Sequence, residues 1–258
     1  MKKGIIVVSF GTSYEKTRKL CIESIENRIR EEYEDFLVLR AFTSQMVIDK
    51  LKKRDNYLVD NPKEALEKMK DDNIENIYIQ PLHIIPGHEY EKLLEQAYKF
   101  SKGNDSINIQ IGKPLLFYDS DYSKVVKGLD FVKAKDGEAM VFMGHGTDHF
   151  ADKSYQRLEN KFKEKDYKNV FIGTVEGKKT IDDIIPILKE QSIKKVRLMP
   201  FMLVAGDHAI NDMASDENSW KTKLLAEDID VEVILKGLGE VKGIQDIYMN
   251  HLNRILTI

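Results

Sequence analysis

Short apolar runs alternate with amphipathic stretches along the first half of the chain. The runs are typical of buried strands, and they lie at residues 5–10, 36–39, 77–79 and 107–111. The stretches between them place apolar residues at helical spacing, as at Cys21, Ile25 and Ile29. One helix is expected to begin at Asn61, because Asn caps, Pro62 fits the first turn and Glu64 follows three residues later. Strands that alternate with helices predict a parallel sheet covered on both faces.

The second half of the chain repeats this plan. Phe10-Gly11-Thr12 matches His145-Gly146-Thr147, and residues 61–80 align without gaps on residues 180–199 at an offset of 119. The polar segment 133–137 is the natural boundary. The fold class predicted is therefore α/β, with two similar open parallel-sheet domains of the βα-repeat, Rossmann or flavodoxin-like kind. The domains are expected at 1–132 and 133–258, with the active site in the cleft between them. The first would form one wall of this cleft, and the second would carry the metal ligands.

Composition excludes several classes of function. The chain has 258 residues, of which 42% are hydrophobic and 32% charged, and its formal charge is −3. We find no basic run with interleaved aromatic residues, so nucleic acid is not expected as a partner. The single cysteine, Cys21, excludes an intrachain disulfide and a cysteine-ligated cluster, and it is interpreted as a small buried core residue.

The basic start Met1-Lys2-Lys3 leads straight into an apolar run. This run is too short for a signal peptide and is better interpreted as the first strand. No run approaches the roughly 20 apolar residues that a membrane span needs. We therefore expect a cytoplasmic protein without a membrane partner.

Three potential metal ligands occur one strand–helix unit apart in the second half. His145, Glu176 and His208 each follow an apolar run, at spacings of 31 and 32 residues. In an open parallel sheet, groups just beyond the carboxyl ends of strands meet in a common crevice. Two imidazoles and a carboxylate in such a crevice predict a nitrogen and oxygen metal site.

Further polar residues follow the strands of the first half. The 119-residue offset places Glu89 at the position equivalent to His208, and Phe10 stands where the second half has His145. His83 follows a strand among apolar residues, and it is interpreted either as a ligand contact or as a satisfied buried histidine. The segment from Ser9 to Ser13 could bind an anion at a helix N-terminus.

Three other residues have either two possible roles or only a structural one. Asp207 either orients a ring nitrogen of His208 or caps the next helix. His149 is expected near the site or on the surface, and His251 is expected to be structural. The motifs GxGxxG, GxxxxGK[ST], GxSxG and HExxH are all absent.

Four segments, in order, resemble the anaerobic-pathway sirohydrochlorin cobaltochelatases. They are Val7–Ser13, Met143–Thr147, Val175–Gly177 and Ala205–Ala209. These enzymes are class II chelatases, related more distantly to ferrochelatases. The resemblance implies a two-domain lyase that inserts Co²⁺ into sirohydrochlorin during cobalamin synthesis. It also implies that His145 and His208 bind the metal, with Glu176 as a carboxylate on the metal side and Glu89 as a further acidic group.

Metal insertion requires that the cation lose water and that two pyrrole protons leave the ring. We predict that His145 both holds the metal and accepts a proton, with Glu89 and Glu176 as further catalytic carriers. No organic cofactor is expected, and Co²⁺ is the substrate metal, although Ni²⁺, Fe²⁺ or Zn²⁺ could occupy the same ligands. The residues expected to bind the tetrapyrrole are Ser9, Phe10, Gly11, Thr12, His83 and Gly146.

Other functions remain alternatives. They are a chelatase for another metal or tetrapyrrole, such as a ferrochelatase-like enzyme using Fe²⁺ or Ni²⁺, and a non-catalytic metal or tetrapyrrole-binding protein. A metallohydrolase ranks third, since it lacks an established motif. The sequence does not decide the physiological metal, whether sirohydrochlorin or its reduced precursor is the substrate, the oligomeric state (a homo-oligomer is left open), or which residue removes each proton.

Overall fold

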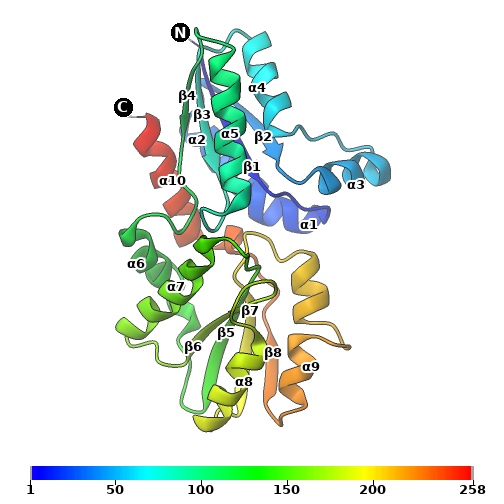
Figure 1. Ribbon diagram of the computed structural model, residues 1–258, viewed down its shortest axis with the longest axis vertical. Coiled ribbons are helices and arrows are strands. Elements are labelled where there is room, and N and C mark those ends of the chain that lie inside the picture. The colour runs from blue at the N-terminus through cyan, green and yellow to red at the C-terminus, as the bar shows by residue number, and fades with distance from the viewer. Residues whose placement is uncertain (1, 257–258) are drawn as a thin grey trace. The chain divides into compact units, whose positions relative to one another are not determined.

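The computed structural model describes residues 2–256, which form two compact units (Figure 1). Unit 1 comprises the described parts of Met1–Phe117 and Ile244–Ile258, and unit 2 is Tyr118–Gly243. No helix within residues 2–256 is both long and apolar enough to cross a bilayer.

Unit 1 contains a sheet of four parallel strands in the order β2-β1-β3-β4. The strands are β1 (Lys3–Ser9), β2 (Phe36–Phe42), β3 (Asn76–Pro81) and β4 (Asn108–Ile111). The helices are α1 (Glu15–Arg18), η1 (Lys19–Glu23), α2 (Ser24–Glu32), α3 (Gln45–Asp55), α4 (Pro62–Asp71), α5 (His88–Lys102) and the chain's last helix α10 (Lys242–Leu256).

Unit 2 repeats the same topology, with four parallel strands in the order β6-β5-β7-β8. The strands are β5 (Glu138–Gly144), β6 (Val170–Thr174), β7 (Lys195–Pro200) and β8 (Asp230–Val233). The helical elements are α6 (Asp119–Gly128), η2 (Asp130–Val132), η3 (Phe150–Asp152), α7 (Lys153–Glu164), α8 (Ile181–Glu190), η4 (Ala209–Met213), α9 (Trp220–Leu225) and η5 (Leu238–Glu240). The predicted fold class of two similar parallel-sheet α/β domains is confirmed.

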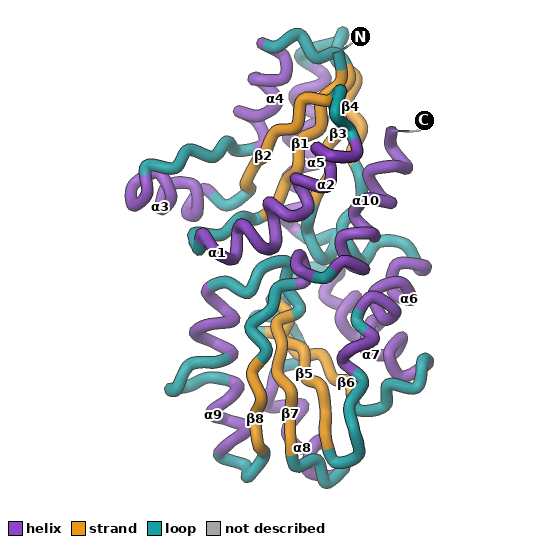
Figure 2. Tube along the Cα trace, turned by 180° about the vertical axis from the view of Figure 1, so that it is seen from behind, coloured by secondary structure: helices purple, strands orange, loops and turns teal. Residues whose placement is uncertain are grey.

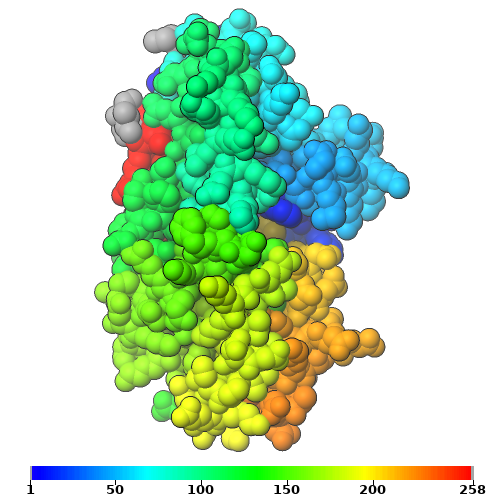
Figure 3. Space-filling view, viewed as in Figure 1, coloured from blue at the N-terminus to red at the C-terminus, as the bar shows by residue number. Residues whose placement is uncertain are grey.

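Helices cover both faces of the sheet in unit 1. Seen from the front, α4 and α5 cover one face, and the space-filling view shows them closing over the strands (Figures 1 and 3). From behind, α2 and α10 lie on the other face (Figure 2). The strands alternate accordingly, since Ile6 and Val8 pack in the same apolar cluster as Leu66 and Leu93. In unit 2 the corresponding cluster joins β5 and β7 to α8 and α9.

The unit division differs from the predicted boundary between residues 132 and 133. The last helix returns to unit 1, where the Tyr248 hydroxyl donates to the Leu82 carbonyl at 2.9 Å and Arg28 pairs with Asp246 at 2.7 Å. Residues 118–132 lie in unit 2, and Arg197 donates to the Val132 carbonyl at 2.9 Å. These contacts join segments more than 60 residues apart in the chain, which the local pattern could not indicate.

The helix starts that the sequence predicts are present. The helix predicted after β1 is not one continuous α-helix, because a π-helical turn interrupts it. Asn61 and Thr180 both cap their helices in reciprocal capping boxes. Residues 19–23 form a π-helical turn between α1 and α2, and residues 209–213 form a second one. π-helical turns are rare in proteins, and those that occur often lie at functional sites.

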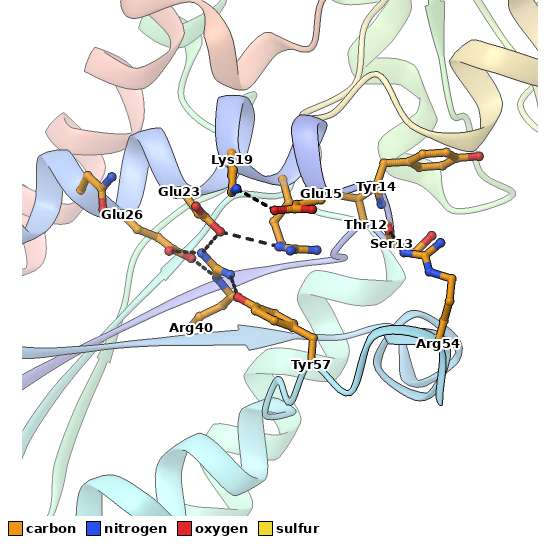
Figure 4. Close-up of polar contacts among 12 residues, drawn as sticks. Thr12, Ser13, Tyr14, Glu15, Lys19, Glu23, Glu26, Arg40, Arg54 and Tyr57 are labelled. Atoms are coloured by element: carbon orange, nitrogen blue, oxygen red, sulfur yellow. Dashed lines mark hydrogen bonds and ion pairs between the residues drawn. The ribbon is translucent and has the colours of Figure 1, made fainter. Parts of the chain in front are cut away.

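A buried ion-pair network ties α2 to β2 in unit 1 (Figure 4). The Glu26 side chain is fully buried and receives two hydrogen bonds from the Arg40 guanidinium, at 2.7 and 2.6 Å. Arg40 also donates to the Tyr57 hydroxyl at 2.6 Å and lies 3.2 Å from the Glu23 carboxylate. The Arg18 guanidinium stacks 4.3 Å above the Tyr57 ring. Through Tyr57, the network holds the segment after α3 against α1 and β2.

Substitution of Glu26 by alanine should destabilise the protein strongly. Arg40 would keep a mostly buried charge without its bidentate partner, and such losses cost about 3 kcal/mol. The measurement is urea unfolding followed by circular dichroism. Glu15→Ala is the matched control, because Glu15 pairs with Lys19 on the exposed surface and its loss should leave the unfolding free energy nearly unchanged. Equal effects of the two substitutions would contradict this account.

Candidate metal centre

The strand order of unit 2 reverses beside β5, and the predicted metal ligands lie at this point. The chain passes from β5 to β6 on one side and then returns to β7 on the other. His145 directly follows β5, Glu176 comes two residues after β6, and His208 comes eight residues after β7. Loops that leave opposite faces of an open sheet at such a reversal leave a crevice at its carboxyl edge.

Within unit 2, the side chain of His145 lies beside both His208 and Glu176. The His145 and His208 rings are perpendicular, with centroids 4.7 Å apart. Nδ1 of His145 lies 3.7 Å from Oε2 of Glu176. The three side chains are 45%, 35% and 59% exposed for His145, His208 and Glu176, so a solvated ion could reach them.

In both histidines, Nδ1 lies next to an oxygen acceptor, which leaves Nε2 as the nitrogen that could bind a metal. Nδ1 of His145 lies 3.0 Å from the Gly146 carbonyl, and Nδ1 of His208 lies 2.7 Å from Oδ2 of Asp212. A carbonyl or carboxylate oxygen only accepts, so in the neutral rings Nδ1 carries the hydrogen and Nε2 the lone pair. Nε2 is therefore the ring nitrogen that each imidazole can offer to a metal ion.

Asp212 is a residue that the sequence analysis missed. It lies in the π-helical turn η4, which begins directly after His208, and its carboxylate contacts the ring across that turn. The contact with Nδ1 thus comes from Asp212, whereas the sequence analysis had considered Asp207. The spacing of four residues between a histidine and an aspartate was the available signal. Carboxylates in this position fix the orientation of a ligand histidine and raise its basicity.

Close backbone approach allows the His145 and Glu176 loops to lie side by side. The backbone N–H of Val175 donates to the Gly144 carbonyl at 3.1 Å, and that of Glu176 donates to the His145 carbonyl at 2.8 Å. Gly146 has φ of +84°, and a Cβ there would lie 2.3 Å from the Gly177 nitrogen. Only glycine fits this position, so the predicted substrate contact at Gly146 also has a structural role.

The first loop of unit 1 occupies the equivalent position after β1. Ser9 is buried, and among the described residues its hydroxyl has no hydrogen-bond partner. Phe10, which replaces the histidine of the second half, is 47% exposed. Gly11 has φ of +95°, with the Phe42 ring against its backbone. Thr12 is buried and accepts a hydrogen bond from the Tyr14 N–H at 3.2 Å.

His83 and Glu89 lie near the carboxyl edge of the same sheet. Both ring nitrogens of His83 are buried without a hydrogen-bond partner among the described residues. Burial lowers the pKa of His83 to about 4, although the nearby Glu89 opposes the shift. Burial alone would raise the pKa of Glu89, but the Thr43 hydroxyl and Lys92 outweigh it and lower that pKa. The pair is thus a neutral imidazole beside an ionised carboxylate.

His149 and His251 both have local hydrogen-bond partners. Nδ1 of His149 accepts a hydrogen bond from the Ala151 N–H at 3.1 Å and caps the short helix η3. His251 is buried in α10, with Nδ1 3.0 Å from the Lys113 carbonyl. Its structural interpretation agrees with this position.

His83 should make stability depend on acidity. Because its folded-state pKa lies below the value of about 6.5 for a free histidine, the unfolded chain takes the proton first as the pH falls. Stability is retained above pH ~6.5 and should decrease by about 3 kcal/mol as the pH falls to ~4. His83→Gln should flatten this slope in urea unfolding between these pH values. A slope equal to that of the wild type would mean that His83 is not held neutral.

Asp212→Asn should weaken metal binding without unfolding unit 2. An amide is a poorer acceptor than a carboxylate for the N–H of His208, so affinity should decrease about 10-fold or more. Isothermal titration with Co²⁺ measures the change, and circular dichroism checks the fold. An unchanged affinity would contradict an orienting role for Asp212.

Comparison with known proteins places the chain among the chelatases. The family model described as "Cobalt chelatase (CbiK)" matches residues 3–257. The chain is 38% identical over 261 residues to the sirohydrochlorin cobaltochelatase of Salmonella typhimurium, covering 100% of this chain and 98% of that protein. It is 35% identical over 264 residues to the sirohydrochlorin cobaltochelatase CbiKC of Nitratidesulfovibrio vulgaris, covering 99% of this chain and 91% of that protein.

Solved structures show the same fold at low identity. SirB from Bacillus subtilis with Fe³⁺ matches with a TM-score of 0.67 at 13% identity, covering 99% of this chain and 96% of that chain. SirB from Bacillus subtilis subspecies spizizenii in complex with cobalt matches with a TM-score of 0.66 at 13% identity, covering 99% and 95%. These likenesses support the fold alone. Because the family model and both relatives match almost from end to end, the chain belongs to the CbiK family of cobalt chelatases.

Proposed function

We propose that this chain inserts Co²⁺ into sirohydrochlorin in the anaerobic synthesis of cobalamin. The observation that carries the proposal is the position of His145 beside both His208 and Glu176 at the strand-order reversal of unit 2, with all three side chains partly exposed. Membership of the cobalt chelatase family and two relatives named as sirohydrochlorin cobaltochelatases support the choice of metal and tetrapyrrole.

The ligand set suits a metal that must be released again. Two neutral imidazoles and one carboxylate bind borderline divalent cations without the closed cage that four thiolates form. Positions left to water on the ion are those that ring nitrogens can take over. Ni²⁺, Fe²⁺ and Zn²⁺ prefer similar ligands, so they should also bind here. No organic cofactor takes part in this reaction.

Insertion replaces two protons of the tetrapyrrole by one Co²⁺, so charge balances when both protons reach the protein or water. His145 holds the ion first, and its Nε2 becomes free to accept a proton once the ion has passed to the ring. Glu176 can do the same through its carboxylate. Glu89 of unit 1 is proposed as a further proton carrier, because its ionised form is favoured.

Unit 1 is proposed to contact the tetrapyrrole through the residues that follow its strands. Phe10 exposes a flat apolar ring that can pack against a macrocycle. Ser9 and His83 have buried polar atoms that would gain a partner from a bound ring. Neutral His83 can both donate and accept a hydrogen bond without a charge penalty. Gly11 and Thr12 complete the proposed set in unit 1, and Gly146 is the proposed substrate contact in unit 2.

A cytoplasmic biosynthetic role belongs to the same proposal. It is supported by the family and by the activity named for the two relatives. The proposed partners are the tetrapyrrole and a divalent metal ion, with no nucleic acid or membrane partner.

His145→Ala and His208→Ala should each lower cobalt insertion at least 100-fold. Each removes one of the two nitrogen ligands, so the ion would be bound weakly and in a poor geometry. The measurement is the change in sirohydrochlorin absorbance after addition of Co²⁺. Glu227→Ala is the control, since the Glu227 carboxylate pairs with Lys189 on the exposed surface of unit 2 and its loss should leave most of the activity.

The same assay with Fe²⁺, Ni²⁺ and protoporphyrin tests the choice of substrate. Faster turnover with protoporphyrin and Fe²⁺ would favour a ferrochelatase-like enzyme. Near-normal cobalt insertion by both histidine variants would remove the proposed metal site.

A further inference from the structure

The direct backbone pairing between the two ligand loops ends at the metal ligands themselves. Its last hydrogen bond runs from the Glu176 N–H to the His145 carbonyl at 2.8 Å. Beyond this point the loops would be free to separate. The two side chains are neighbours, with Nδ1 of His145 3.7 Å from Oε2 of Glu176, so a small separation of the loops would move both side chains apart.

Beyond this hydrogen bond, the two loops are joined by the Asp152 carboxylate instead of by direct backbone contacts. Its Oδ1 accepts the Thr147 N–H at 3.2 Å, and its Oδ2 accepts the Lys178 N–H at 3.3 Å. Thr147 lies two residues after His145, and Lys178 lies two residues after Glu176. One side chain therefore holds both loops at equivalent positions just past the two metal ligands.

Asp152 belongs to neither loop and is itself held in place. It is the last residue of η3 and directly precedes α7, whose residues Tyr155, Leu158 and Phe162 are buried. The His149 ring caps η3 by accepting the Ala151 N–H. The carboxylate thus extends from a packed element, which gives it a defined position relative to the sheet.

The chemistry of this contact calls for a carboxylate. Both partners are backbone N–H donors, so the side chain must accept at both of its terminal atoms. An asparagine has one accepting oxygen and would direct an N–H₂ group at one of the two donors. Space is equally restricted, because a Cβ on Gly177 would lie 2.4 Å from Oδ1 of Asp152.

We propose that Asp152 is a positioning residue that sets the separation of His145 and Glu176 and so determines how tightly the substrate metal is bound. The inference rests on the proposed function, since it assumes that these two residues bind the ion. The Glu176 side chain is 59% exposed, and its loop is anchored at its base by the Thr174 N–H, which donates to the Lys179 carbonyl at 2.7 Å, and at Lys178 by Asp152. Without Asp152 the ion would have to order this loop on binding, which lowers the affinity.

The first test compares Asp152→Asn with the wild type by isothermal titration with Co²⁺. The expected result is about a 10-fold weaker affinity, as for other residues that orient metal ligands. The KM for Co²⁺ should rise while the KM for the tetrapyrrole stays constant. The visible absorption spectrum of bound Co²⁺ should also change, because it reports the ligand geometry directly.

Asp166→Asn is the matched control. It removes the same charge from unit 2, in the turn after α7, where asparagine tolerates the φ of +65°. Affinity and spectrum should equal those of the wild type. If Asp152→Asn lowers only the unfolding temperature and leaves affinity and spectrum unchanged, the residue is merely structural and the inference is wrong.

Gly177→Ala provides a second test that keeps the carboxylate. The added methyl group would press on Asp152 Oδ1 and on Thr174 Oγ1, each at 2.4 Å, and force the contact apart. It should weaken Co²⁺ binding, whereas Gly103→Ala, whose nearest atom would be 3.7 Å away, should not. Unchanged binding in Gly177→Ala would overturn the inference even if Asp152→Asn failed to fold.

The two proposals can fail separately. Wild-type protein that binds Co²⁺ but never metallates sirohydrochlorin would contradict the proposed function, and the binding tests of Asp152 would stand. Wild-type protein that metallates sirohydrochlorin, with an affinity insensitive to Asp152 and Gly177, would contradict only the positioning role.

Discussion

Parallel pairing on both sides of β5 is the constraint on which the candidate site depends. Because β6 and β7 both run parallel to β5, all three carboxyl ends lie at one edge of the sheet. The reversal of strand order sends the connecting chain to opposite faces and keeps that edge open. His145 and His208 are 63 residues apart in the sequence, yet their ring centroids are 4.7 Å apart. No local interaction between them could produce this proximity.

Hydrogen-bond acceptors and one glycine at this edge of the sheet set the orientation of the histidine rings and the distance between the loops. The Gly146 carbonyl and the Asp212 carboxylate engage Nδ1 of the two imidazoles, which leaves Nε2 for an ion. The positive φ of Gly146 lets the neighbouring loop approach to contact distance. The resulting ligand set is defined in orientation but remains partly exposed. Such an arrangement fits a metal that is bound only until a macrocycle takes it.

The two units share one topology but differ in the chemistry at the same edge. Phe10 stands where unit 2 has His145, and Glu89 is the equivalent of His208. Unit 1 therefore presents an aromatic ring, a carboxylate and the neutral imidazole of His83. This set lacks the paired imidazoles that make a metal centre. In the proposed function, this set contacts a flat ring and takes up protons, while the second half binds the metal.

The sequence by itself determined the periodic features of this protein. Apolar runs, the capping residues Asn61 and Thr180 and the repeat offset predicted two parallel-sheet units, because each depends on neighbours within a few residues or on a shared period. The same regularity placed His145, Glu176 and His208 at strand ends. Only the tertiary structure decided that α10 returns to unit 1, that Asp212 contacts His208 and that Asp152 joins the loops after β5 and β6. Those contacts depend on a π-helical turn and on side chains meeting across loops, and neither leaves a periodic signal in the sequence.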